Sequence, residues 1–267
     1  MSASSTLVGW VVAFVLFGGL VGAAEVGFRW GARKGSKTDR ADQLGAIQGA
    51  ILGLLGLLLG FSFSGASGRF SARVQMIVEE ANAIRDVGLK IDLMPEGQQP
   101  AMRDMLRRYV DLRVAYYEVA GEDALEPVVA ETRALQAKIW SAGIQAVKAT
   151  PTFAGVWLPP LTEVFDLYGR RLDASRRNLP VLIVLLLLAC SGVAVGSVSY
   201  GCGIAHRRNA VLTTALAFLV AAVLWAIIDM DHPRRGLIRA GQEPMLKLRH
   251  SLEGGDAAGL PLHQAHQ

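Results

Sequence analysis

The sequence predicts an all-α membrane protein with four transmembrane helices and a helical extramembrane bundle inserted between the second and the third. Of the 267 residues, 52% are hydrophobic and only 19% are charged, a composition typical of membrane proteins. Four apolar runs are each long enough to cross a bilayer as a helix. The long segment between the second and third runs has apolar residues at helical spacing and no strand-like alternation.

The first apolar run covers about residues 6–24, and Glu25 closes it. Phe28 and Trp30 follow at the expected level of the lipid headgroups, where aromatic side chains are common. The run is longer than the core of a signal peptide, and no Lys or Arg precedes it. We therefore expect a retained first transmembrane helix, followed by a short basic linker.

The second run is the stretch around which the chain is organised. Residues 44–93 predict one uninterrupted helix, of which about 44–66 crosses the membrane and the remainder continues as an amphipathic helix outside it. Small residues at steps of three and four lie along one face of the first part, and we call them the glycine stripe: Gly45, Gly49, Gly53, Gly56 and Gly60, with Ser64 and Gly68 in continuation. Small residues let helix backbones approach closely in lipid. The stripe therefore predicts a packed face, either within the chain or against a neighbouring subunit.

Polar and aromatic residues in the same helix suggest a second interpretation. Gln48, Ser62 and Ser64 lie at membrane depth, where polar side chains usually face protein or water. They favour a subunit-contacting or pore-lining helix. Phe61 and Phe63 alternate with the serines, and such side chains can form a constriction that gates a pore by excluding water. Ordinary anchoring at the membrane interface is the alternative for both.

The insert, residues 67–178, is too polar for the lipid core and predicts helices throughout. Breaks are expected at residues 94–97, at Gly121 and at residues 150–151. Pro159 and Pro160 are expected to end a short irregular segment, with a last helix over residues 161–177. These helices should form a bundle.

Two further spans are expected at about residues 181–204 and 210–228, so that the chain divides into a hairpin (1–66), the bundle (67–178), a second hairpin (179–230) and a polar tail (231–267). An even number of spans places both termini and the insert on one side of the membrane. The distribution of Lys and Arg near the ends of the spans favours the cytoplasmic side of an inner membrane.

No enzymatic motif is recognisable, since the sequence lacks a P-loop, a dinucleotide fingerprint, HExxH and GxSxG. We expect no catalytic residue, metal or cofactor. The two cysteines, Cys190 and Cys202, lie in or at the end of one apolar run and have no zinc-site spacing. The net charge of +4 comes from basic residues beside apolar runs. Anionic lipid headgroups are therefore the expected partners of these charges, and nucleic acid is not.

Arg69 and Arg73 follow the second span and share a helical face. In a symmetric oligomer they would form basic rings at a pore mouth, which attract anions. Contact with lipid headgroups is the alternative.

Two groups of charged residues predict structural polar networks. Glu79, Asn82 and Asp86 lie near one helical face, with Asn82 close enough to the apolar stripe to be a buried amide. Asp229 and Asp231 stand where the fourth span ends, and acids at a membrane edge need partners. Their predicted partners are Arg69, Arg73 and Arg235.

The stretches LLGLLLGFSFSGASGRFSARVQMIVEEANAI and DMDHPRRGLIRAGQEPMLKL, with Leu93-Met94-Pro95 between them, resemble the bestrophin-like domain family of bacterial membrane proteins. The resemblance extends over about residues 44–248. It implies a relation to bestrophins, pentameric anion channels with four spans, cytoplasmic termini and a pore lined by the second span. The acidic run of the bestrophin calcium clasp has no counterpart here, because Asp229 and Asp231 are only two acids, so calcium gating is not implied.

These observations lead to two hypotheses. The first is a homo-oligomeric protein of the inner membrane that conducts small anions through a pore lined by the second span. The second is a membrane-anchored helical module that binds a partner or senses a ligand without transport activity. An uncovered glycine stripe in the folded chain would favour the first.

Overall fold

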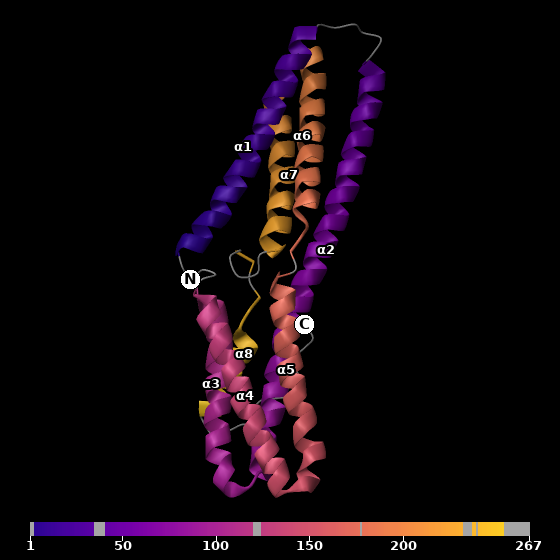
Figure 1. Cartoon of the computed structure of the whole chain (residues 1–267). Coiled ribbons are helices and arrows are strands. Elements are labelled where there is room, and N and C mark those ends of the chain that lie inside the picture. Colours follow the sequence, from indigo (N-terminus) through magenta and orange to yellow (C-terminus); the bar gives the residue numbers. More distant parts are fainter. Residues whose placement is uncertain are drawn as a thin grey trace. The chain divides into compact units, whose positions relative to one another are not determined.

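The computed structural model describes residues 3–34, 41–119, 124–176, 178–231, 237–238 and 240–253 (Figure 1). These residues are almost entirely helical, and none of them lies in a β-strand. The chain folds into two compact units. Unit one comprises Met1–Ser71 and Asn178–Arg239, and unit two comprises Ala72–Arg177 and Ala240–Gln267.

Unit one contains α1 (Ala3–Lys34), the first part of α2 (Ala41–Lys90), α6 (Val181–Ile204) and α7 (Ala210–Asp231). All four helices are long and apolar enough to cross a membrane, which agrees with the predicted spans. Large apolar side chains cover their outer surfaces, among them Phe14 (70% exposed), Leu182 (77%) and Val211 (81%). Such a surface is stable in lipid and not in water.

Contacts at the helix ends show that the spans alternate in direction. The indole N–H of Trp225, near the end of α7, donates to the carbonyl oxygen of Gly9, near the start of α1, over 3.1 Å. At the opposite end, Arg208, just before α7, pairs with Glu25 of α1. The start of the first span and the end of the last therefore lie at the same end of unit one, as an even number of spans requires.

The closest helix contact in unit one joins α1 and α6 through glycines. A Cβ atom added to Gly27 would overlap the carbonyl oxygen of Gly196, and one added to Gly203 would overlap that of Phe28. Gly31 meets the carbonyl oxygen of Tyr200 in the same way. Backbone-to-backbone packing of this kind is a common way to hold transmembrane helices together.

The first part of α2 packs on the other spans with one face. Leu55, Leu59 and Ala66 are buried in the same apolar cluster as residues of α6 and α7. Their spacing of four and seven residues places them on one side of the helix. This side differs from the glycine stripe. Leu55 and Leu59 each precede a stripe glycine by one residue, which corresponds to about 100° of rotation around the helix.

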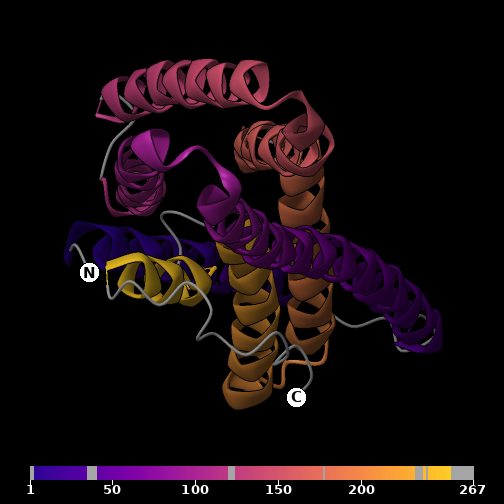
Figure 2. The same ribbon diagram turned by 90° about the horizontal axis from the view of Figure 1, so that it is seen from below.

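Unit two is a helical bundle, as predicted (Figures 1 and 2). The second part of α2 ends in the 3-10 turns Ile91–Leu93 and Glu96–Gln98, as the sequence Met94-Pro95 indicates. It is followed by α3 (Gln99–Glu118), α4 (Leu125–Ala149), the 3-10 turn Pro151–Phe153, α5 (Ala154–Arg176) and α8 (Glu243–Glu253). The largest fully buried side chains include Ile77, Tyr109, Ile139 and Trp157, which come from α2, α3, α4 and α5.

The expected start of the last helix of the insert was wrong. Helix α5 begins at Ala154 and contains Pro159 and Pro160, which were expected to precede it. Trp157 is fully buried and packs on Gly143 of α4. The hydroxyl of Thr162 donates to the carbonyl oxygens of Leu158 and Pro159. Burial of the indole and this side-chain hydrogen bonding help to offset the cost of prolines within the first turns.

Part of the predicted polar tail is also ordered. Residues 243–253 form α8, which packs on α3 with Met245 and Leu248 buried. The Nε of Arg107 donates to the carbonyl oxygen of Leu252 over 3.0 Å. Two buried apolar residues three positions apart are too weak a pattern to stand out in a charged segment.

Candidate functional site

The glycine stripe of α2 is not covered by any other described part of the chain. A Cβ atom added at Gly45, Gly49, Gly53, Gly56 or Gly60 would meet no atom of the described residues within 4 Å, and the same holds for Gly68. Gly27 and Gly31 of α1 and Gly203 of α6 behave in the opposite way, since a Cβ atom added to any of them would overlap backbone of the facing helix. Among the described residues, the stripe therefore has no packing partner within the chain.

Gln48 belongs to the packed side of α2 and not to the stripe. Its amide nitrogen donates to the carbonyl oxygen of Ser197 in α6 over 2.6 Å. Polar groups at membrane depth were expected to face protein or water, and Gln48 faces protein. Gln48 therefore links two spans of one chain and does not lie on the proposed pore face.

Phe61 and Phe63 are both exposed, at 69% and 44%, but they lie on different faces of α2. Two residues correspond to about 200° of rotation around a helix. Phe63 follows Gly60 by three residues and Gly56 by seven, so it lies on the stripe. Phe61 lies away from Gly56 and nearer to the continuation of the stripe, since Ser64 and Gly68 follow it by three and seven residues. Ser64 continues the stripe and is exposed, whereas Ser62 is half-buried.

The acids at the end of α7 have distinct roles. Asp231 is 3% exposed and accepts from the Nε of Arg69 over 3.1 Å and from the backbone N–H of Leu179. This confirms the predicted pairing of Asp231 with Arg69. Asp229 instead accepts from the backbone N–H groups of Leu237 and Ile238, over 2.9 and 2.7 Å.

The two aspartates thus fix the segments that enter and leave the membrane region of unit one. Asp231 links α2 to the residues that precede α6, and Asp229 holds the residues that follow α7. The predicted partner Arg235 lies outside the described residues.

Arg69 and Arg73 do not form the pair of exposed basic groups that their spacing suggested. The side chain of Arg69 is 35% exposed and paired with Asp231. Arg73 is only 7% exposed, and its Nε donates to the carbonyl oxygen of Ala174 in α5 over 3.2 Å. Arg73 is therefore a buried residue of unit two, a position that fits neither lipid contact nor a basic ring.

The predicted network of Glu79, Asn82 and Asp86 is wrong. Asn82 is exposed and not a buried amide. Glu79 accepts from Gln75, and Asp86 from Lys90, each one turn away on α2 itself. The three residues lie on the outer side of the helix because Ile77, Ile84 and Val87 turn the opposite side inward.

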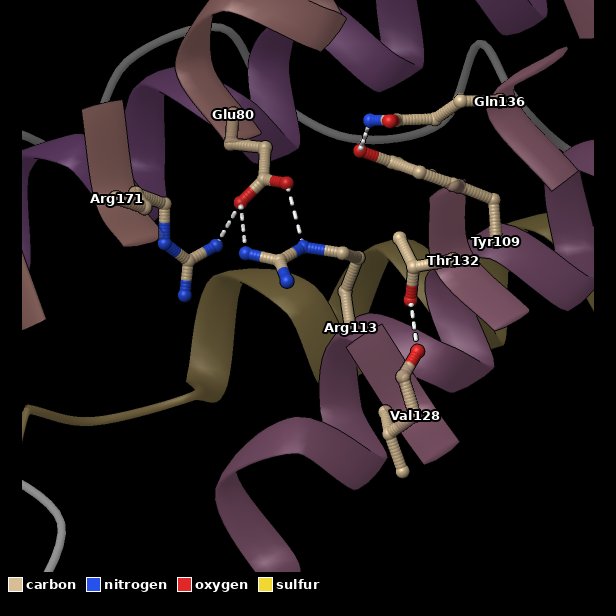
Figure 3. Close-up of polar contacts among 7 residues, drawn as sticks. All are labelled: Glu80, Tyr109, Arg113, Val128, Thr132, Gln136 and Arg171. Carbon is tan, nitrogen blue, oxygen red and sulfur yellow. Dashed lines mark hydrogen bonds and ion pairs between the residues drawn. The ribbon is translucent and has the colours of Figure 1, made fainter. Parts of the chain in front are cut away.

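The buried polar cluster of unit two is built on the adjacent residue, Glu80. Its carboxylate is fully buried and accepts from Arg113 of α3 through Nε, over 2.6 Å, and through Nη2, over 3.2 Å. A second guanidinium, from Arg171 of α5, donates to it through Nη1. Figure 3 shows one carboxylate between the two arginines. Glu80, Arg113 and Arg171, the Glu80 cluster, thus join three helices in the core of unit two.

Aromatic rings surround both guanidiniums. Arg113 lies over the rings of Tyr168, at 4.7 Å, and Tyr116, at 5.5 Å. Arg171 lies over the ring of Tyr117 at 5.1 Å. The face of an aromatic ring attracts a cation, so these contacts compensate part of the cost of burying positive charge.

The sequence contained a signal for this cluster. Glu80 falls between Ile77 and Ile84, three and four residues away, and so belongs to the apolar face of α2. Arg113 likewise lies on the apolar face of α3. A charged residue on an apolar face requires a buried partner, but which carboxylate meets which guanidinium is a property of the folded bundle.

The geometry can be compared with known proteins. The bestrophin-like domain family matches residues 12–245. The chain belongs to this family. No curated protein matches this bestrophin-like chain.

Solved structures agree with the fold of this bestrophin-like chain. It is similar to a bacterial bestrophin homologue from Klebsiella pneumoniae, with 14% identity and a TM-score of 0.63 over 90% of this chain and 99% of that one. A crystal structure described as a variant of a membrane protein gives 15% identity and a TM-score of 0.65 over 93% and 99% of the two chains. At such identities the likeness concerns the fold alone.

Charge interactions within the cluster shift the pKa values of Glu80 and Arg113. Burial by itself raises the pKa of Glu80, but the charges of Arg113 and Arg171 and their hydrogen bonds outweigh it, so the pKa of this carboxyl lies below its ordinary value. Burial alone would lower the pKa of Arg113, but the charge of Glu80 outweighs this effect, so the pKa of Arg113 lies above its ordinary value. Both groups are therefore charged at neutral pH.

A carboxyl whose pKa is lowered by folding stabilises the folded protein above the pKa of the unfolded chain. This contribution disappears as pH falls from about 4.5 through the lower folded pKa. We therefore expect unit two of this bestrophin-like protein to lose stability in acid, as measured by thermal unfolding in detergent between pH 7 and pH 3. Glu80→Gln should flatten the steepest part of this dependence. An unchanged acid profile in that variant would show that other carboxyl groups are responsible.

Proposed function

We propose that this bestrophin-like protein assembles with copies of itself into an anion channel in the inner membrane, with α2 of each subunit lining the pore. The observation that carries the proposal is the uncovered glycine stripe of α2. A face of small residues in lipid is explained by a helix contact or a narrow water-filled path, and no described part of the same chain supplies that contact. Membership of the bestrophin-like family supports the same conclusion.

Phe63 is the proposed constriction. Its ring projects from the stripe and is 44% exposed, so copies of it in a ring of subunits would narrow the pore with apolar groups. An apolar constriction opposes ion passage by excluding water. Phe61 is on the opposite side of the helix from Phe63, farther from Gly56 and Gly60, and is assigned no such role.

Arg69 is the proposed contributor of positive potential near the end of the pore helix. Its pairing with Asp231 over 3.1 Å reduces the charge that it presents to an anion. Its effect on ion preference should therefore be modest. Arg73 has no part in the pathway because it is buried against α5. The termini and unit two are proposed to lie on the cytoplasmic side.

The first test is chloride flux through the purified protein in liposomes, with Phe63→Ala and Phe61→Ala as a matched pair. Phe63→Ala should increase the rate of chloride flux several-fold because it removes the apolar constriction. Phe61→Ala removes the same ring two residues earlier and should leave the rate unchanged. Equal effects of the two variants would contradict the assignment of Phe63.

A folded and inserted wild-type protein that conducts neither chloride nor potassium would contradict the channel itself. Weight would then move to the alternative, a membrane-anchored module whose helical unit two binds a partner or ligand. The oligomeric state, determined by native mass spectrometry in detergent, should show several copies of the chain if the stripe is a subunit face.

A further inference from the structure

The Glu80 cluster contains more positive than negative charge. One carboxylate serves two guanidiniums, and the side chains of Glu80, Arg113 and Arg171 are 0%, 3% and 3% exposed. Charges removed from water in this way need compensation by a nearby opposite charge. Arg113 donates one hydrogen bond to each carboxylate oxygen of Glu80. Arg171 donates to Oε2, which it shares with Arg113. The guanidinium of Arg171 is thus only partly neutralised.

The unsatisfied hydrogen-bonding capacity is concentrated on Arg171. Its Nε and Nη2 are both buried and have no hydrogen-bond partner among the described residues. These two nitrogens form the side edge of the planar group, a fork whose parallel N–H bonds suit a single anion. Figure 3 shows one terminal nitrogen of Arg171 toward Glu80 and the other directed away from it.

We propose that the Nε and Nη2 edge of Arg171 binds a small monovalent inorganic anion of the size of chloride in the core of unit two. Buried donors in native proteins are almost always paired, and a charged pair of donors favours an anion over water because water leaves the excess charge in place. The anion completes a balanced set of two guanidiniums, one carboxylate and one bound charge.

The size of the ligand follows from the surroundings. Arg171 is 4% exposed, with Glu80 on one side and the ring of Tyr117 at 5.1 Å. Because the free edge of this guanidinium is so enclosed, the proposed ligand is a small inorganic anion and not an organic carboxylate. The site lies among α2, α3 and α5 of unit two and is structural, so it does not depend on whether the protein conducts ions.

The test is the thermal unfolding of the full-length protein in detergent, with chloride or bromide exchanged for gluconate at constant ionic strength. If the anion is bound at concentrations well above its dissociation constant, it should raise the unfolding temperature of the wild type by roughly 5 °C relative to gluconate. Arg171→Gln should remove at least half of this anion-specific increase. Its own unfolding temperature is not the readout, because losing a guanidinium also changes packing.

Arg170→Gln is the matched control, since the preceding residue has a side chain that is 58% exposed and only a 4.0 Å contact with Glu163. It should keep the full halide-dependent increase. If Arg171→Gln does not fold, Arg171→Lys keeps the charge but loses the fork, and should respond to halide less than the wild type does. The proposal is overturned if the wild type is equally stable in chloride and gluconate. It is also overturned if folded Arg171→Gln or Arg171→Lys keeps the full increase.

Discussion

Glu80→Gln is expected to destabilise unit two by about 3–5 kcal/mol, because breaking a buried ion pair leaves uncompensated charge in the protein interior. The substitution keeps the size of the side chain and removes only its charge, while Arg113 and Arg171 remain buried. The aromatic rings over the two guanidiniums compensate a small part of that cost. The measurement is the free energy of unfolding from urea titrations of the detergent-solubilised protein, followed by fluorescence.

Glu131→Gln provides the control for this prediction. Glu131 also pairs with an arginine, Arg108, over 2.9 Å, but the two side chains are 49% and 56% exposed. Exposed ion pairs contribute about 0–1 kcal/mol, so the variant should unfold nearly as the wild type does. A loss below about 1 kcal/mol in Glu80→Gln, similar to that of the control, would mean that the buried cluster contributes little to stability.

Gly27→Ala is expected to destabilise unit one by about 3 kcal/mol, the upper end of the usual cost of overpacking. The new methyl group would overlap the carbonyl oxygen of Gly196. A backbone atom cannot rotate away as a side chain can, so α1 and α6 must separate and lose contacts along their length. Gly203→Ala should destabilise unit one similarly, because its methyl group would overlap the carbonyl oxygen of Phe28 in α1. The measurement is the fraction of folded protein in increasing concentrations of a denaturing detergent.

Gly19→Ala is the matched control in the same helix. A Cβ atom at Gly19 meets no atom of the described residues within 4 Å, and alanine favours a helix over glycine by up to about 1 kcal/mol in water. We therefore expect no loss of stability. If Gly27→Ala and Gly19→Ala proved equally harmless, the close approach of α1 and α6 would be refuted.

Much of the fold followed from local patterns. The four apolar runs, the break at Met94-Pro95 and the start of α6 after Pro180 are all where the sequence predicted them. Length, hydrophobicity and proline positions are properties of neighbouring residues, so they can be interpreted without knowledge of the rest of the chain. The prolines of α5 are the exception, because the buried indole of Trp157 and its contact with Gly143 come from the fold.

The candidate site followed from the sequence only in part. The glycine stripe and the pairing of Asp231 with Arg69 were predicted, the first from helical spacing and the second from the need of an acid for a partner at a membrane edge. The network of Glu79, Asn82 and Asp86 was placed on the wrong face of α2, since the buried acid is Glu80, one residue after Glu79. A shift of one residue turns a side chain by about 100°, enough to exchange core for solvent.

The sequence by itself determined that this protein is helical, crosses a membrane and carries a stripe of small residues on its second span. Only the tertiary structure decided that Gly27 and Gly31 of α1 pack closely on α6, whereas the stripe glycines of α2 meet no other described residue. It also decided that one carboxylate is shared by two arginines from different helices. The physical reason is that hydrophobic length and helical period are encoded locally, whereas the partner of a packed face or a buried charge is chosen by residues far away in the chain.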